Sequence, residues 1–131
     1  LGQIFHDQIP AIQKQCDIYV SLNKMCNLTN ANLEALRSGT CMILPQAQPK
    51  LGIDVDTQKL VPEDAAIRVS LASNITELAE KIVYLAKNHN IRKLLGIRAK
   101  EVADKIIPDW DSRINNELII LENLLLKNSV N

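Results

Sequence analysis

The stretch that decides the fold is IYVSLNKMCNLTNANLEALRSGTCMIL, residues 18–44. Its two ends are mostly apolar, which predicts buried strands at Ile18–Leu22 and Cys41–Leu44. Between them, a polar loop precedes a helix at Asn30–Ser38, which Gly39 closes in the C-cap position. Because the connections are short, this order of strand, loop, helix and strand predicts a crossover between two parallel strands.

The rest of the chain adds further α/β signals and ends in helices. Apolar residues recur there at spacings of three and four, and Pro108 ends the second of these helices. Asn74 with Glu77 has capping-box spacing, while Asn90 and Asp109 stand where they can cap the next two helices. The expected fold is α/β, a partial Rossmann-like parallel sheet with three C-terminal helices. The other expected elements are a helix at 7–15, a loop at 46–57, strands at 59–61 and 66–71, and helices over 75–85, 91–106 and 110–127.

The last predicted helix carries more apolar residues than one face can hold. Its main stripe begins at Trp110, which we expect to be a core anchor, and continues through Ile114, Leu118, Leu121 and Leu125. Four more apolar residues lie outside this stripe and would face water if the helix rested on one side of a small domain. We therefore expect a second partner surface. These residues are Ile119, Ile120, Leu124 and Leu126.

Composition sets limits on the function. The 131 residues suffice for one domain with a core, and their fifteen basic and fifteen acidic side chains cancel. No overall field therefore favours nucleic acid, and we expect no nucleic-acid partner. Cys16, Cys26 and Cys41 lack C-x-x-C spacing, and His6 and His89 stand far apart, so no disulfide framework and no metal site are predicted. We expect a cytoplasmic setting, no cofactor and no membrane-spanning segment.

The loop and helix at residues 23–38 carry the most informative chemistry. Open α/β sheets bind ligands at the carboxyl ends of their strands. The first N–H groups of a helix lack internal partners and carry the positive end of its dipole, so the amides near Thr29–Ala31 predict a phosphate site. One turn later, Glu34 is placed to accept hydrogen bonds from two ribose hydroxyls. Phosphate and ribose together indicate a nucleotide.

The same segment resembles the retaining GT-B glycosyltransferases of family 4. In that family Leu-Glu-Ala-Met/Leu is followed by a small residue, a glycine and a strand, as are Leu33–Leu36 by Ser38–Thr40 and Cys41–Leu44 here. The resemblance covers nearly the whole chain. Other segments similar to the family are Gly2–Cys16, Leu60–Pro62, Ile75–Leu85, Ile91–Gly96 and Asp109–Trp110.

The resemblance implies which residues hold the donor. The family motif has two glutamates separated by seven residues, and Glu34 matches the second, which holds the nucleotide ribose. Cys26 stands at the first position, and the sugar-contacting role is not transferred to it. Asn27 and Thr29 replace the family's glycines, and Asn27 with Asn30 is similar to an Asn-x-x-Asn pattern of divergent members. The implied donor-binding residues are Asn27, Leu28, Thr29, Asn30, Ala31 and Glu34.

The resemblance also implies an activity. A sugar is transferred from a nucleotide diphosphate-sugar to a hydroxyl acceptor of a glycan, glycolipid or polysaccharide precursor, with retention and without a metal. Residues 1–131 then form part of the C-terminal nucleotide-sugar-binding domain. The expected partners are the donor and an N-terminal acceptor domain of the same parent chain. By itself this chain is expected to be inactive, because one wall of the cleft lies in that other domain.

Several alternatives stay open. The missing first glutamate favours a non-catalytic GT-B-like nucleotide-binding or scaffold subunit, and a GT-B-fold sugar-nucleotide epimerase is a third interpretation. From spacing alone, Glu34 is also compatible with a solvated helix residue, and Cys26 with an ordinary loop cysteine. The basic residues within 92–100 form either a solvated helix face or a contact with anionic lipid headgroups, which would make the parent protein membrane-associated.

Overall fold

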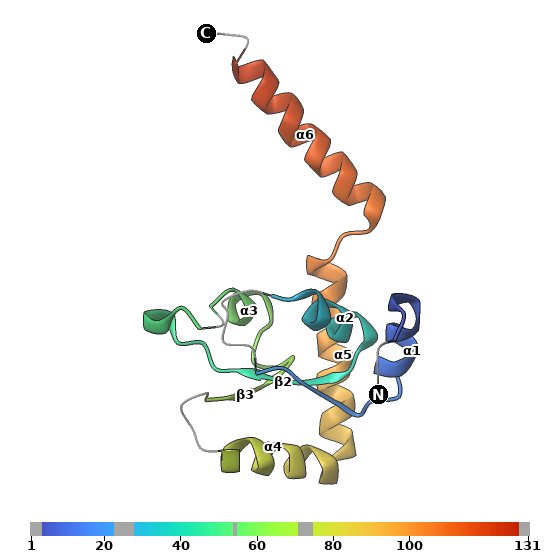
Figure 1. Cartoon of the computed structure of the whole chain (residues 1–131), viewed down its shortest axis with the longest axis vertical. Coiled ribbons are helices and arrows are strands. Elements are labelled where there is room, and N and C mark those ends of the chain that lie inside the picture. Colours follow the sequence, from blue (N-terminus) through green and yellow to red (C-terminus); the bar gives the residue numbers. More distant parts are fainter. Residues whose placement is uncertain (1–3, 23–27, 54, 71–74, 129–131) are drawn as a thin grey trace.

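A small parallel sheet forms the centre of the chain. The computed structural model describes residues 4–22, 28–53, 55–70 and 75–128. Its strands are β1 (Ile18–Val20), β2 (Cys41–Pro45) and β3 (Ile67–Val69), in the order β1-β2-β3 (Figure 1). Both pairs are parallel, and Ile43 is the register partner of Val20 on one side and of Ile67 on the other. The α/β class and the parallel pairing of the first two predicted strands are confirmed.

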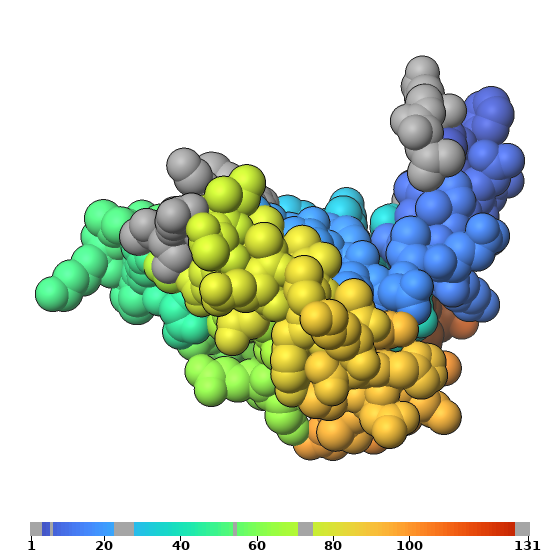
Figure 2. All heavy atoms as spheres, turned by 90° about the horizontal axis from the view of Figure 1, so that it is seen from below, coloured from blue at the N-terminus to red at the C-terminus, as the bar shows by residue number. Residues whose placement is uncertain are grey.

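Helices cover the sheet from two sides. α2 (Asn30–Ser38) and α3 (Val55–Leu60) lie on one side, and α4 (Ile75–Lys87) lies on the other (Figure 1). α5 (His89–Ile106) contacts α2, β2 and α4 and so joins the two layers. Seen from below, α4 and the first part of α5 form the near face of the molecule in yellow and orange (Figure 2).

Alternate residues of β2 enter two separate apolar clusters. Met42 and Leu44 pack with α2 and the second half of α5, whereas Cys41 and Ile43 pack with α4 and the first half of α5. All four side chains are buried. Because β2 is covered on both faces, its sequence is a continuous apolar run with no alternation of polar residues.

α2 has the bounds that the sequence predicts. Thr29 precedes it in an extended conformation, and the Thr29 hydroxyl accepts a hydrogen bond from the Asn32 N–H at 3.2 Å. This side chain is the N-cap, so the helix begins one residue after it, at Asn30. Gly39 ends the helix in the left-handed region at φ 68°, where a side chain is disfavoured.

α5 crosses the C-terminal turn of α2 at a contact between two glycines. A Cβ atom placed on Gly96 would lie 2.2 Å from the backbone oxygen of Gly39. One placed on Gly39 would lie 3.3 Å from the Gly96 oxygen. The two backbones therefore approach to a distance that only glycine allows at position 96, and this contact fixes α5 on the sheet.

Several predicted connections are wrong in detail. The helix expected at 7–15 is a 3-10 turn, η1 (His6–Gln8), followed by α1 (Ile9–Gln13). The loop expected at 46–57 contains a 3-10 turn, η2 (Pro49–Leu51), and the start of α3. Residues 59–61 are not a strand, because α3 includes Lys59 and Leu60 and the Val61 N–H donates to the Thr57 carbonyl at 2.8 Å. So short an apolar run does not distinguish strand from helix.

Two of the three caps predicted for the C-terminal helices can be compared with the structure, and one of them is confirmed. Asp109 accepts hydrogen bonds from the N–H and the hydroxyl of Ser112, at 2.9 and 2.7 Å, and so caps the last helix as predicted. Asn90 is not a cap, because α5 already begins at His89. Asn74 lies outside the described residues. Its expected partner Glu77 accepts a hydrogen bond from the Ser70 N–H at 3.3 Å.

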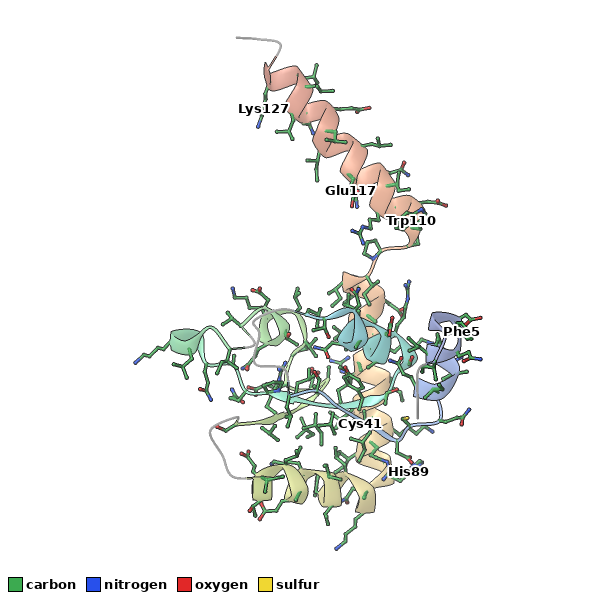
Figure 3. All side chains as sticks on the ribbon, viewed as in Figure 1. Phe5, Cys41, His89, Trp110, Glu117 and Lys127 are labelled. Carbon is green, nitrogen blue, oxygen red and sulfur yellow. The ribbon has the colours of Figure 1, made fainter. Side chains whose placement is uncertain are left out.

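The last helix, α6 (Trp110–Asn128), extends away from the sheet and its helices (Figures 1 and 3). Every residue from 110 to 127 is exposed. The second apolar set is exposed as expected, with Ile119 at 54% and Leu126 at 66%. Trp110 is not a core anchor, because it is 70% exposed and no part of the described body covers the main stripe. No described helix combines the length and apolar character needed to cross a bilayer.

Candidate functional site

The first turn of α2 is the segment in which the sequence predicts a phosphate site. α2 is the crossover between two parallel strands, so its N-terminus lies at the carboxyl edge of the sheet. The first N–H groups of a helix have no acceptor within it. The Thr29 hydroxyl accepts a hydrogen bond from the N–H of Asn32. The amides of Asn30 and Ala31 lie at the positive end of the helix dipole. Both of these residues are exposed.

Glu34 lies in the second turn of α2 and lines a groove against α1. The α1–α2 groove has a volume of about 260 Å³ and is lined by Pro10, Lys14, Glu34, Arg37 and Ser38. Glu34 is partly buried, whereas Lys14 and Arg37 are exposed. A carboxylate that accepts hydrogen bonds therefore shares one groove with two cationic donors.

Two hydrogen bonds accepted by Gln13 hold α1 against the end of α2. The Ser38 hydroxyl donates to the side-chain oxygen of Gln13 at 2.8 Å, and the Thr40 hydroxyl donates to its backbone oxygen at 3.3 Å. Lys14 is the next residue in the chain. These bonds therefore help to bring Lys14 to the groove that Arg37 also lines.

A polar contact that the sequence did not reveal lies beneath the first turn of α2. Asn32 is only 2% exposed, and its side-chain oxygen accepts a hydrogen bond from the Tyr19 hydroxyl of β1 at 3.0 Å. Burial raises the pKa of Tyr19, a hydrogen bond with Ser21 lowers it, and the negative charge of Glu34 raises it. This contact ties the helix to the strand beside Glu34. The only sequence signal for this contact was the position of Asn32 among the apolar residues of the helix.

The predicted donor-binding residues divide into three groups. Thr29, Asn30 and Ala31 surround the helix N-terminus, and Glu34 lies about one turn further along the same helix. Leu28 packs against the apolar cluster that contains Leu36, so its side chain has a structural role. Asn27 lies outside the described residues, as does Cys26.

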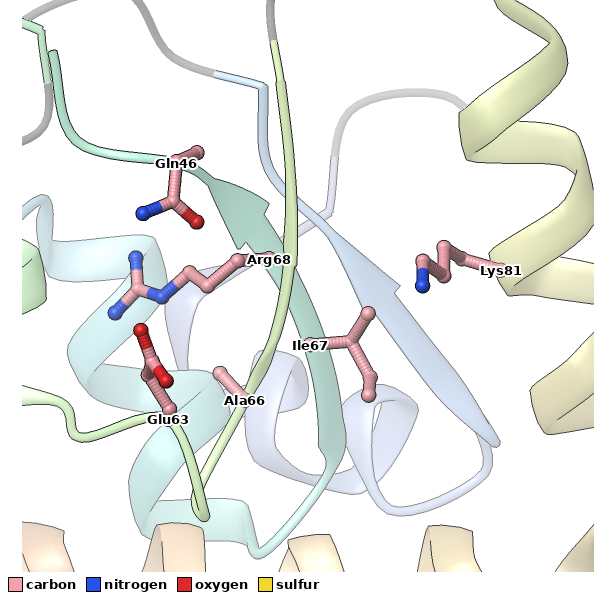
Figure 4. A pocket seen from close by; sticks show the side chains of 6 residues that line it. All are labelled: Gln46, Glu63, Ala66, Ile67, Arg68 and Lys81. Carbon is pink, nitrogen blue, oxygen red and sulfur yellow. The ribbon is translucent and has the colours of Figure 1, made fainter.

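A second pocket lies along β3, which forms one edge of the described sheet. In Figure 4 the guanidinium of Arg68 lies between the side chains of Gln46 and Glu63, while Lys81 lies across the strand. Arg68 donates to the carbonyl oxygens of Pro45 at 3.0 Å and Val61 at 2.7 Å. Arg68 therefore connects the end of β2 to the segment after α3, and we assign it a structural role.

A third pocket lies at the opposite, amino end of the strands. Its lining includes Cys16, Cys41 and His89. Arg92 and Asp17 also line it and form an ion pair at 3.3 Å. Burial raises the pKa of Cys41 to about 11, although the charge of Arg92 lowers it, so this thiol stays protonated at neutral pH. Among the described residues, no three His, Cys, Asp or Glu side chains come together as metal ligands do.

Comparisons with protein families, with curated proteins and with solved structures give no match for this chain. Its function is therefore inferred from its residues and their geometry. The strongest combination is the first turn of α2 with Glu34 and the α1–α2 groove.

Proposed function

We propose that this chain forms part of the donor-binding half of a retaining glycosyltransferase with a GT-B fold. In this proposal α2 binds a nucleotide diphosphate-sugar, with its first turn against the diphosphate and Glu34 against the ribose. The observation that carries the proposal is the partly buried Glu34, in the second turn of a crossover helix between parallel strands.

The catalytic contribution of these groups is electrostatic. The amides of Asn30 and Ala31, together with the helix dipole, stabilise the charge that develops on the departing diphosphate. Glu34 orients the nucleotide and transfers no proton. The sugar moves to a hydroxyl acceptor with retention at the anomeric carbon, and the reaction as proposed uses no metal.

Two features support a longer parent chain. Among the described residues, β1 pairs with β2 alone, so its other edge can pair with further strands of the same donor-binding domain. α6 leaves its apolar side chains uncovered, including Leu118 and Leu121 at 50% and 56% exposure. In this proposal the acceptor domain of the same parent chain is the partner that covers α6. Cytoplasmic location and peripheral membrane contact belong to the same proposal for the parent protein.

A non-catalytic nucleotide-binding or scaffold subunit is the second candidate. Cys26 favours it, because a cysteine stands where the family has its first glutamate. Such a subunit binds the nucleoside diphosphate but does not transfer sugar. Release of nucleoside diphosphate from a sugar nucleotide by the complete parent protein supports the transferase, whereas binding without release supports the scaffold.

Calorimetric titration of the complete parent protein with UDP, GDP and ADP tests the shared binding step. Glu34→Gln is expected to weaken binding by roughly 1.5–3 kcal/mol, because the ribose hydroxyls then face a neutral amide and lose their hydrogen bonds to a charged carboxylate. Glu80→Gln on the exposed face of α4 is the matched control and should leave the affinity unchanged. Equal affinities of the Glu34→Gln variant and the unchanged protein, with both folded, would remove the main support for the proposal.

A further inference from the structure

The α1–α2 groove contains two cations to which the proposed function gives no role. Lys14, which follows α1, and Arg37 of α2 line it beside Glu34, and its volume is about 260 Å³. Pockets that enclose a whole small molecule have roughly 300–1,000 Å³. The groove therefore has room for a part of a nucleotide, and the part that adjoins the ribose on the side away from the phosphates is the base.

The helix itself sets the order of the nucleotide along the groove. At 1.5 Å per residue, Glu34 lies about 6 Å and Arg37 roughly 10 Å from Asn30 along the axis of α2. An anionic diphosphate is favoured at the N-terminus, where the first-turn amides and the positive end of the dipole lie. With the ribose at Glu34, the base then extends towards Arg37 and Lys14. The negative end of the dipole near Arg37 disfavours the reverse orientation.

The two cations restrict the chemistry of the base. Lysine and arginine side chains only donate hydrogen bonds, so they match a base edge that carries acceptors. Guanine presents two neighbouring acceptors, O6 and N7, and uracil presents the O4 acceptor, whereas adenine has an amino donor at N6 beside its N7 acceptor. We propose that Lys14 and Arg37 select a donor with an oxo base, guanine or uracil, over one with adenine. This inference rests on the proposed function of Glu34 and α2.

The surrounding contacts hold this pair in place without using its charges. The bonds that Gln13 accepts from Ser38 and Thr40 fix the end of α1, and the next residue, Lys14, lines the same groove as Arg37. Arg37 occupies that last turn and is exposed, as is Lys14. Both side chains therefore exchange water for the base on binding and bury no charge in the free protein.

The test compares three nucleoside diphosphates in the complete parent protein by calorimetric titration. UDP or GDP should bind on the order of tenfold more tightly than ADP, the scale of discrimination of a good base contact. The double variant Lys14→Ala, Arg37→Ala should bind the preferred nucleotide and ADP within about threefold of each other, with ADP affinity unchanged. Lys105→Ala, on an exposed part of α5, is the control and should retain the preference. Thermal melting verifies that each variant is folded.

The outcomes separate this inference from the function on which it rests. If the double variant weakens all three nucleotides equally, Lys14 and Arg37 hold phosphate and the base assignment is wrong. If it changes nothing while Glu34→Gln weakens binding, the nucleotide site stands and the two cations are solvated surface residues. If the unchanged protein binds none of the three nucleotides, the proposed function and this inference both fail.

Discussion

The body of the chain and α6 contain similar apolar side chains but place them very differently. Leu36 and Leu44 in the body are completely buried, whereas Leu121 and Leu125 in α6 are 56% and 67% exposed. Packing stabilises the body, and α6 relies on its own hydrogen bonds, caps and side-chain pairs, such as Arg113 with Glu117 at 3.0 Å. The same residue type therefore contributes to stability in one region and forms an uncovered surface in the other.

Matched leucine truncations should give the largest contrast between the two regions. Leu44→Ala is expected to lower the free energy of unfolding by about 2–5 kcal/mol, because it leaves a cavity between α2 and β2. Leu121→Ala should change it by at most about 0.5 kcal/mol. Urea denaturation followed by far-ultraviolet circular dichroism measures both. Fluorescence of Trp110, the only tryptophan, would report on α6 instead of the body.

The same pair of variants tests whether a partner covers α6. If the acceptor domain lies on this helix, Leu121→Ala should cost more in the complete parent protein than in the 131-residue chain. The cost of Leu44→Ala should be similar in both, since β2 is already enclosed. Equal, small effects of Leu121→Ala in the two chains would contradict the proposed contact.

Gly96→Ala should disturb the body next most strongly. In an ordinary helix interior this change stabilises by roughly 1 kcal/mol. Here we expect a loss of about 1–3 kcal/mol, because the new Cβ meets the Gly39 oxygen at 2.2 Å. Gly52→Ala is the comparison, because Gly52, unlike the helical Gly96, has a positive φ of 65°, and nothing lies within 4 Å of its added Cβ, so any cost there comes from the backbone conformation alone. A stabilised Gly96→Ala variant in thermal and urea melts would refute this packing of α5 on α2.

Loss of the α2 cap should have a smaller effect. Thr29→Ala removes the acceptor for the Asn32 N–H and is expected to cost about 1 kcal/mol of unfolding free energy. Thr29→Ser keeps a hydroxyl at the same position and should restore most of this stability. Urea melts of the three proteins provide the measurement, and equal midpoints for alanine and serine would mean that the hydroxyl does not cap the helix.

The sequence predicted the parts of the molecule in which local and tertiary signals agree. α2 has an apolar face and a terminal glycine, so its bounds followed from residues 30–39, although the cap itself is Thr29 and was not predicted. At residues 59–61 the pattern was too short to separate strand from helix. Trp110 was misplaced because an apolar stripe shows that a helix needs a partner but not where that partner lies. Lys14 was missed because the hydrogen bonds from Ser38 and Thr40 to Gln13 join residues 25 and 27 positions apart.

The smallest predicted effect concerns the N-terminus of α6 in acid. Two hydrogen bonds from Ser112 lower the pKa of Asp109 from its ordinary value of 3.8, and the backbone bond is the larger cause. Because the pKa in the folded state is the lower one, ionised Asp109 favours the capped helix. The stabilisation of the capped helix by ionised Asp109 is complete above the ordinary pKa of 3.8 and is lost as the pH falls through the lowered pKa of the folded state. The Ser112 amide should therefore lose protection from hydrogen exchange below about pH 4.

Asp109→Asn keeps an acceptor but does not titrate, so this pH dependence should vanish. A loss of amide protection in acid that both proteins share has another cause than Asp109. An identical pH profile of the Ser112 amide in the two proteins would show that Asp109 does not control this end of α6.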